Sequence, residues 1–81
     1  YWEEDCSAAM QNILLSANAL GFGSVWLGAR HGDNDLEGKL KSLLNVPAGI
    51  ALMGIAAIGR ALETKDPHKW IDPHSLHYGK W

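Results

Sequence analysis

The sequence predicts a mixed helix and sheet fold, of the α/β or α+β class, that is incomplete at its front edge. Apolar residues recur every three or four positions through the first part of the chain, as in a helix with one buried face. Two short apolar runs follow, with a second helical pattern between them. The expected order is therefore helix, strand, helix, strand and extended arm.

The first helix is expected to bury a stripe of apolar residues and to end at Gly21, a natural C-terminal cap. Acidic residues lie in its first turn, where negative charge suits the helix dipole. Residues 24–28 read SVWLG, a run too short for a helix, which favours a buried strand. The predicted stripe, expected in the core, consists of Cys6, Met10, Ile13, Leu14, Ala17 and Leu20.

A second helix is expected to begin at Asp33 or Asp35 and to run to about Leu44, since Asn and Pro follow. Residues 50–58 are continuously apolar, which favours a second strand covered on both faces. Residues 61–81 are polar with scattered aromatics and two Asp-Pro steps. That composition is typical of an extended arm whose aromatic residues dock on something else.

Composition indicates a soluble globular protein without a nucleic-acid or membrane partner. The chain is 47 % hydrophobic with a net charge of −2, and its seven Lys and Arg are scattered rather than clustered. Its longest apolar run is shorter than the about 20 residues that span a bilayer. A single cysteine suits a reducing cytoplasm. We therefore expect a cytoplasmic location. Because the chain opens at Tyr1 rather than Met, we also expect a fragment or a processed chain.

Five segments, in order, resemble the nitroreductase family. Residues 5–15 read DCSAAMQNILL and residues 19–28 read ALGFGSVWLG, similar to the family's D-x-x-x-A-x-Q-N-x-L-L helix and G-L-G-S-x-W-x-G strand. Residues 40–47 read LKSLLNVP and residues 55–59 read IAAIG, similar to its next helix, with the turn after it, and its next strand. The tail, residues 72–81, reads DPHSLHYGKW and resembles the family's charged, aromatic C-terminus.

The resemblance implies an α+β fold, a sheet flanked by helices in three layers, present here only as its C-terminal part. Residues 1–81 would be the C-terminal portion of one nitroreductase-like domain, with a helix and strand core at 1–60 and an extended arm at 61–81. Family members are usually longer homodimers that bind FMN with both subunits. The family's arginine-rich flavin motif is missing from this sequence. The implied partner is therefore a second copy or a complementing N-terminal half.

The resemblance also implies an oxidoreductase in which NAD(P)H reduces FMN and FMN reduces nitroaromatics, quinones or similar small molecules. No catalytic side chain is identified. Trp26, Leu27, Gly28 and Ala29 match the family's stretch along the flavin ring. Gly28 would allow the ring to approach the backbone, because a side chain would hold it away. The alternative is a glycine that only ends a strand.

A second set of residues is implied at the flavin phosphate. Gly59 and Arg60 end the second strand, which the family often brings near this phosphate, and a guanidinium suits phosphate by charge and geometry. Lys69 is a further candidate, although Trp70 stands where a family arginine is common. The alternative for Lys69 is a solvated surface lysine.

Two other functions are compatible with the residues. A non-catalytic helix and strand module that folds by pairing with a partner chain would explain the surplus of apolar and aromatic surface. A metal site would have to use His68, His74 and His77, but zinc needs three or four convergent ligands and this segment is expected to be irregular. We therefore expect no metal site. His31 is interpreted as a loop histidine, with a position facing substrate as the alternative.

Overall fold

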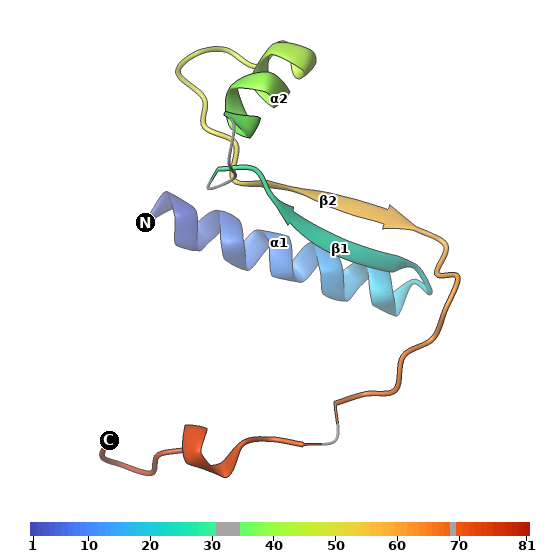
Figure 1. The fold of residues 1–81 in the computed structure, drawn as a ribbon, viewed down its shortest axis with the longest axis vertical. Coiled ribbons are helices and arrows are strands. Elements are labelled where there is room, and N and C mark those ends of the chain that lie inside the picture. Colours follow the sequence, from blue (N-terminus) through green and yellow to red (C-terminus); the bar gives the residue numbers. More distant parts are fainter. Residues whose placement is uncertain (31–34, 69) are drawn as a thin grey trace.

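The computed structural model describes residues 1–30, 35–68 and 70–81. Within these residues the elements are α1 (Trp2–Ala19), β1 (Gly23–Gly28), α2 (Leu36–Leu44), β2 (Gly54–Gly59) and a short 3-10 helix, η1 (Pro73–Ser75). This order of helix, strand, helix, strand and arm is the predicted one, and the fold is a partial α+β fold (Figure 1).

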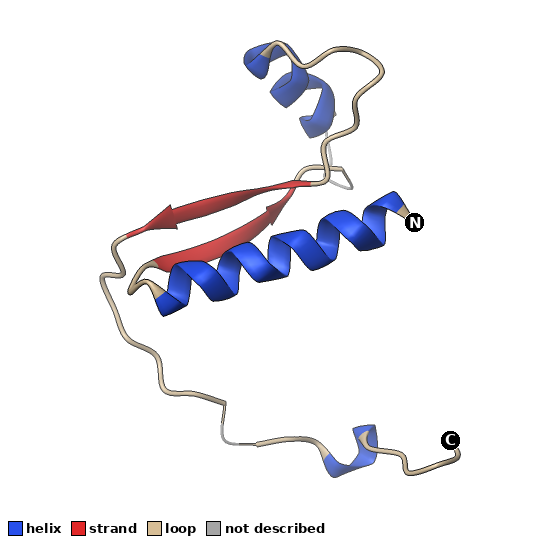
Figure 2. Ribbon diagram, turned by 180° about the vertical axis from the view of Figure 1, so that it is seen from behind, coloured by secondary structure: helices blue, strands red, loops and turns tan. Residues whose placement is uncertain are grey.

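The strands β1 and β2 form an antiparallel ribbon, and α1 packs along it. The register pairs Gly23 with Gly59 at one end and Gly28 with Gly54 at the other. Figures 1 and 2 show α2 beyond the Gly28 end, whereas the arm leaves from the Gly59 end. The two ends of the ribbon, each bounded by a pair of glycines, therefore lead to different parts of the chain.

The acidic first turn predicted for α1 is present, and the C-cap of the helix lies one residue before the predicted one. Three acidic residues lie in its first turn, where they interact favourably with the helix dipole. Leu20 is the C-cap, and Gly21 after it has a φ of 84°, in the left-handed region that glycine adopts most readily. This turn reverses the chain so that β1 can run back along α1.

The buried stripe predicted for α1 is largely exposed. Met10 and Ala17 are buried, but Leu20 is 75 % exposed and Ile13 is about half exposed. Cys6, expected in the core, is exposed as well, so that prediction is wrong. The reason is geometric: a two-stranded ribbon is too narrow to cover the whole apolar face of an 18-residue helix.

α2 begins and ends where the sequence predicts. The Asp35 carboxylate accepts a hydrogen bond of 3.2 Å from the backbone N–H of Gly38, which makes Asp35 the N-cap. Asp33, the other candidate, lies outside the described residues. Asn45 ends the helix in the left-handed conformation, with a φ of 54°.

β2 is shorter than predicted. The expected strand covered residues 50–58, but the ladder begins only at Gly54. Before it, the N–H of Leu52 donates to the Glu37 carboxylate at 3.0 Å, and the N–H of Ile50 donates to the carbonyl of Pro47 at 3.0 Å. These donors are therefore used in a turn and in a contact with α2 rather than in the sheet.

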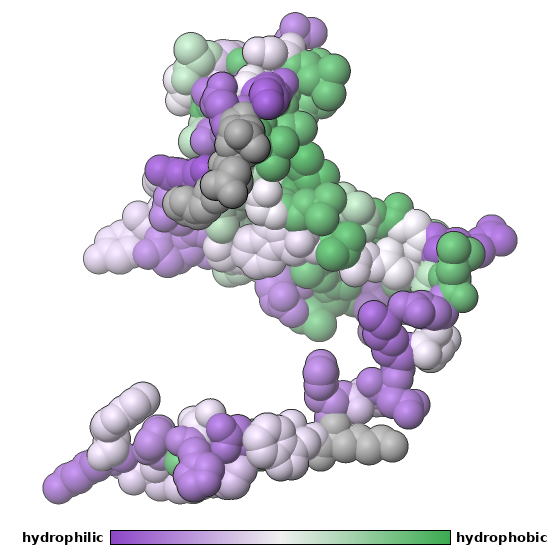
Figure 3. Space-filling model, viewed as in Figure 1, coloured by the Kyte–Doolittle hydropathy of each residue, from purple (hydrophilic) through white to green (hydrophobic). Residues whose placement is uncertain are grey.

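The prediction that this strand is covered on both faces is also wrong within the described chain. Ile58 is 51 % exposed, and the outer face of the ribbon carries exposed Val25, Leu27 and Ile55. Figure 3 shows this apolar surface continuing toward α2. Continuous apolarity in a strand signals that two layers cover it, but α1 supplies only one of them here.

The chain is much more open than a compact protein of its mass. Its accessible surface is 7309 Å², whereas a compact monomer of 8.8 kDa would expose roughly 4,800 Å². Its radius of gyration is 16.7 Å, against about 12 Å for a compact domain of this length. The arm contributes to this shape, because it extends away from the ribbon and its aromatic residues Trp70, Tyr78 and Trp81 are exposed (Figure 1). No helix among the described residues combines the length and apolarity needed to cross a membrane.

Candidate functional site

The predicted ring-facing residues lie at the end of β1 that leads toward α2. Trp26, Leu27 and Gly28 are the last three residues of β1, and Ala29 follows directly. Ala29 is only 1 % exposed, and its N–H approaches the Met53 carbonyl at 3.5 Å. The backbone of this segment is thus restrained by the burial of the Ala29 methyl group and by the contact with Met53, the residue before β2.

Gly28 leaves open space beside this backbone. A Cβ built at Gly28 would meet no atom of the described residues within 4 Å, so another molecule could approach the main chain there. Its cross-strand partner Gly54 is different. A Cβ at Gly54 would lie 2.6 Å from the Trp26 indole nitrogen and 2.9 Å from the Leu27 carbonyl oxygen. A side chain at position 54 would therefore clash with the Trp26 ring and the Leu27 carbonyl, whereas a side chain at position 28 would extend into open space.

Arg30 connects this end of β1 to the start of α1. Its guanidinium forms an ion pair with the Glu3 carboxylate and lies 4.7 Å from the centre of the Trp2 ring. The two side chains of the ion pair are 35 % and 46 % exposed, so water screens their attraction. The contact joins two residues that are 27 positions apart in the sequence.

The predicted phosphate residues lie at the opposite end of the ribbon. Gly59 is the last residue of β2 and pairs with Gly23, and the exposed Arg60 follows it. Six-residue strands at about 3.3 Å per residue separate the two ends by roughly 17 Å. Lys69 lies outside the described residues. The structure therefore does not bring the two predicted groups together in one small pocket.

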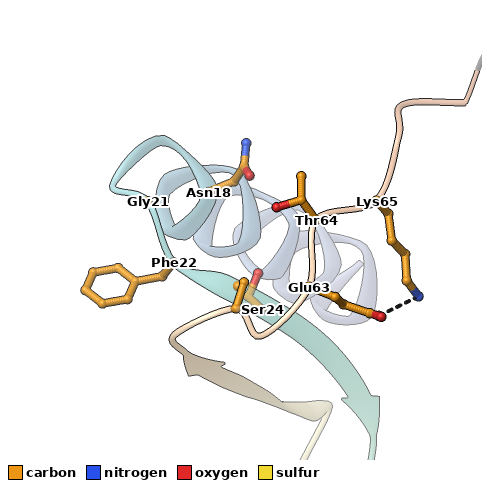
Figure 4. Close-up of a pocket in the computed structure, with 9 residues that line it drawn as sticks. Asn18, Gly21, Phe22, Ser24, Glu63, Thr64 and Lys65 are labelled. Atoms are coloured by element: carbon orange, nitrogen blue, oxygen red, sulfur yellow. Dashed lines mark ion pairs between the residues drawn. The ribbon is translucent and has the colours of Figure 1, made fainter.

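A polar hollow of about 600 Å³ lies beside the Gly59 end, where the end of α1, the start of β1 and the first residues of the arm meet. Asn18, Ser24 and Thr64 contribute polar groups to it, and the Phe22 ring points away from them (Figure 4). Lys65 pairs with Glu63 at 3.3 Å, and both side chains are mostly exposed. The hollow therefore offers hydrogen-bonding groups but no unpaired, desolvated charge among these lining residues.

The tail histidines do not converge on a metal site. Among the described residues, no cluster of three or more His, Cys, Asp and Glu could hold a metal ion. His74 lies in η1, where its N–H donates to the Asp72 carboxylate at 3.0 Å, and the His77 ring stacks on Trp81 at 4.3 Å. His31 lies outside the described residues.

A sequence model described as "Nitroreductase family" matches residues 2–60. This range includes α1, both strands and all the predicted site residues except Lys69. The chain belongs to the nitroreductase family. Its α+β architecture and the order of its elements agree with this membership.

Two curated relatives come from archaea, and both carry the provisional name NADH dehydrogenase/NAD(P)H nitroreductase. The protein from Archaeoglobus fulgidus is 39 % identical over 99 % of this chain and 47 % of its own length. The protein from Methanothermobacter thermautotrophicus is 35 % identical over 100 % of this chain and 42 % of its own length. The nitroreductase-family chain thus spans about half the length of the curated relatives that it matches.

Crystal structures with the same provisional name resemble this chain closely. The structure from Bacteroides thetaiotaomicron superposes with a TM-score of 0.88 at 32 % identity, over 100 % of this chain and 48 % of that protein. The structure from Parabacteroides distasonis has a TM-score of 0.86 at 29 % identity, over 99 % and 47 % respectively. The helix and ribbon unit described here is therefore part of a larger fold in these proteins.

Sequence reasoning missed two contacts in the candidate site, one of Gly54 with Trp26 and one of Arg30 with Glu3. Gly54 lay inside a long apolar run, and its close approach to Trp26 depends on the strand register. Arg30 and Glu3 are too far apart in sequence for local spacing to pair them. The available signal was a charged residue two positions after the glycine that ends the predicted strand.

Proposed function

We propose that this chain supplies the flavin-facing, C-terminal part of an FMN-dependent oxidoreductase. A hydride passes from NAD(P)H, by way of FMN, to a nitroaromatic, a quinone or a similar small acceptor. The observation that carries the proposal is the open backbone at Gly28, which lies inside the segment matched by the family model. The provisional names of the relatives support the same class of chemistry.

The residues at the α2 end of the ribbon suit the face of a flavin ring. The segment from Trp26 to Ala29 would present one open backbone position, at Gly28, beside apolar side chains, and burial of Ala29 holds that backbone in place. Bound FMN would supply the redox chemistry, because no protein side chain accepts and returns a hydride in this way. The protein's own contribution is to position the ring and to keep its surroundings apolar.

The residues at the other end suit a phosphate. Gly59, Arg60 and Lys69 would hold it, since a guanidinium forms paired, charge-assisted hydrogen bonds with phosphate oxygens. Arg60 takes part in no ion pair within the described part of the chain. FMN carries its ring and its phosphate at opposite ends of an extended molecule. That shape fits two groups of residues separated by the length of the ribbon.

We further propose that the site is completed by a second copy of this chain or by an N-terminal half that complements it. The open shape and the exposed apolar face of the ribbon support this, because such a surface is normally buried. The excess of roughly 2,500 Å² over a compact monomer is as large as the area buried in stable assemblies. A cytoplasmic location is part of the same proposal.

A second candidate function is a non-catalytic module that folds by pairing with another chain. The exposed apolar surface on β1, β2 and α2 favours it independently of any flavin (Figure 3). Sedimentation at low concentration, together with thermal melting, tests this alternative. A well-folded monomer with a cooperative transition would contradict it.

The flavin proposal is tested by purifying the protein with everything that accompanies it and heating it to release any bound ligand. We expect flavin absorbance and fluorescence in the supernatant, and renewed binding when FMN is added back. Gly28→Leu should weaken FMN binding roughly a hundredfold, about 2.7 kcal/mol, because its side chain fills the open position. Gly21→Asn is the matched control, because asparagine tolerates the left-handed conformation at Gly21 and this turn lies far from the Gly28 backbone. A colourless protein that does not bind added FMN would contradict the proposal.

A further inference from the structure

Arg30, Glu3 and Trp2 form a group of contacts that we call the Arg30 cluster. Within the described residues, its Arg30–Glu3 pair is the one ion pair between side chains that links the end of β1 to α1. The other two ion pairs are local, between the N-terminal amine and Glu4 and between Glu63 and Lys65. Arg30 instead reaches from the exit of β1 to the first turn of α1. Its position directly after the proposed ring-facing residues raises the question of what it does there.

The cluster is built from two different interactions on one guanidinium. The planar group pairs with the Glu3 carboxylate and at the same time lies over the Trp2 ring, 4.7 Å from its centre. Glu3 is independently favoured at its position, since negative charge suits the start of a helix. Arg30 therefore meets a partner that α1 already holds in place, and α1 fixes where Arg30 can lie.

The backbone just before Arg30 is held on its other sides as well. The Ala29 methyl group is buried, and the Ala29 N–H points at the Met53 carbonyl. This N···O distance of 3.5 Å is long for a hydrogen bond, so this contact restrains the peptide weakly. The Arg30 contacts supply the remaining restraint at the point where β1 leaves the ribbon.

We infer that Arg30 is a positioning residue that fixes the peptide bond between Gly28 and Ala29 by tying the end of β1 to Trp2 and Glu3 of α1. The inference rests on the proposed function where it says what this peptide faces. Screened, partly exposed contacts contribute little to overall stability. The Arg30 contacts are therefore expected to act locally, by lowering the frequency with which the Gly28–Ala29 peptide leaves its position.

The test uses Arg30→Gln, Glu3→Gln and Arg30→Lys in the purified protein. Without flavin, we expect amide hydrogen exchange at Ala29 to be about tenfold faster in Arg30→Gln and about threefold faster in Glu3→Gln. Exchange at Met10 and Ala17 in α1 should stay unchanged. Arg30→Lys keeps the charge and should fall between wild type and Arg30→Gln. Glu63→Gln, which removes an exposed local ion pair, is the matched control.

A second readout separates positioning from general weakening. With FMN added, we expect the midpoint potential of the bound flavin to change in Arg30→Gln and to return toward the wild-type value in Arg30→Lys. Unchanged exchange at Ala29, or faster exchange throughout α1, would overturn the inference. An unchanged potential with altered exchange would overturn its link to the ring. If the wild-type protein binds no FMN, the proposed function fails, while the exchange data still decide whether Arg30 fixes this peptide.

Discussion

The two ends of the β1–β2 ribbon are bounded in the same way, by glycines facing each other, yet their surroundings differ. At the Gly28 end, Ala29 is buried, the Trp26 ring lies against Gly54, and Arg30 reaches back to α1. At the Gly59 end, the chain passes directly into an exposed arm, and the nearest ion pair joins two exposed side chains of that arm.

This difference shows which part of the site the chain can build from its own residues. The end proposed to face the ring is held by packing and by contacts between elements, so its backbone is already positioned. The end proposed to hold the phosphate presents an exposed guanidinium and an open polar hollow, and it would need additional protein to surround a ligand. Gly54→Val and Asp35→Ala disturb the packed end or the helix beside it, whereas Arg60→Gln disturbs the open end.

The largest effect is expected from Gly54→Val, which breaks the packed end. Its Cβ would clash with the Trp26 indole and with the Leu27 carbonyl, and the carbonyl cannot move without shifting the ladder. We expect the free energy of unfolding to fall by about 3 kcal/mol, measured by denaturant titration. Gly28→Ala, in the same pair but next to open space, should change it little. Equal losses in both variants would show that the register is not as described.

A smaller effect is expected from Arg60→Gln at the open end. Losing a charge-assisted contact with phosphate should weaken FMN binding about tenfold, or about 1.4 kcal/mol. Binding of riboflavin, which has no phosphate, should not change. Fluorescence titration measures both affinities, and Lys39→Gln on α2 is the control for a lost surface charge. Equal weakening for both flavins would place Arg60 away from the phosphate.

The smallest effect is expected from Asp35→Ala, which loosens α2 next to the packed end. The variant loses the hydrogen bond from the Gly38 N–H and puts alanine at a φ of 56°. We expect a loss of about 1 kcal/mol in unfolding free energy, seen by circular dichroism during denaturation. Asp35→Asn keeps an acceptor and tolerates the left-handed conformation, so it should lose less. An Asn variant as unstable as the Ala variant would contradict the capping role.

Sequence reasoning worked where a local signal sufficed. Gly21 ends α1 in the left-handed region, and the Asp35 side chain caps α2, as their residue types predict. The order of elements and the family followed from spacing and motif order along the chain. Local signals failed to predict burial. Cys6 and Ile58 are apolar residues expected in a core, but the described residues do not cover them.

The sequence by itself therefore determined the element order, the helix ends, the α+β class and the membership of the nitroreductase family, since each depends on residues close together in the chain. Only the tertiary structure decided that Gly28 and Gly59 lie at opposite ends of one ribbon, that Gly54 makes room for Trp26, and that Arg30 pairs with Glu3. Strand register and contacts between distant segments set these relations. No local pattern encodes them, because they arise only when β1 turns back along α1 and β2 aligns with it.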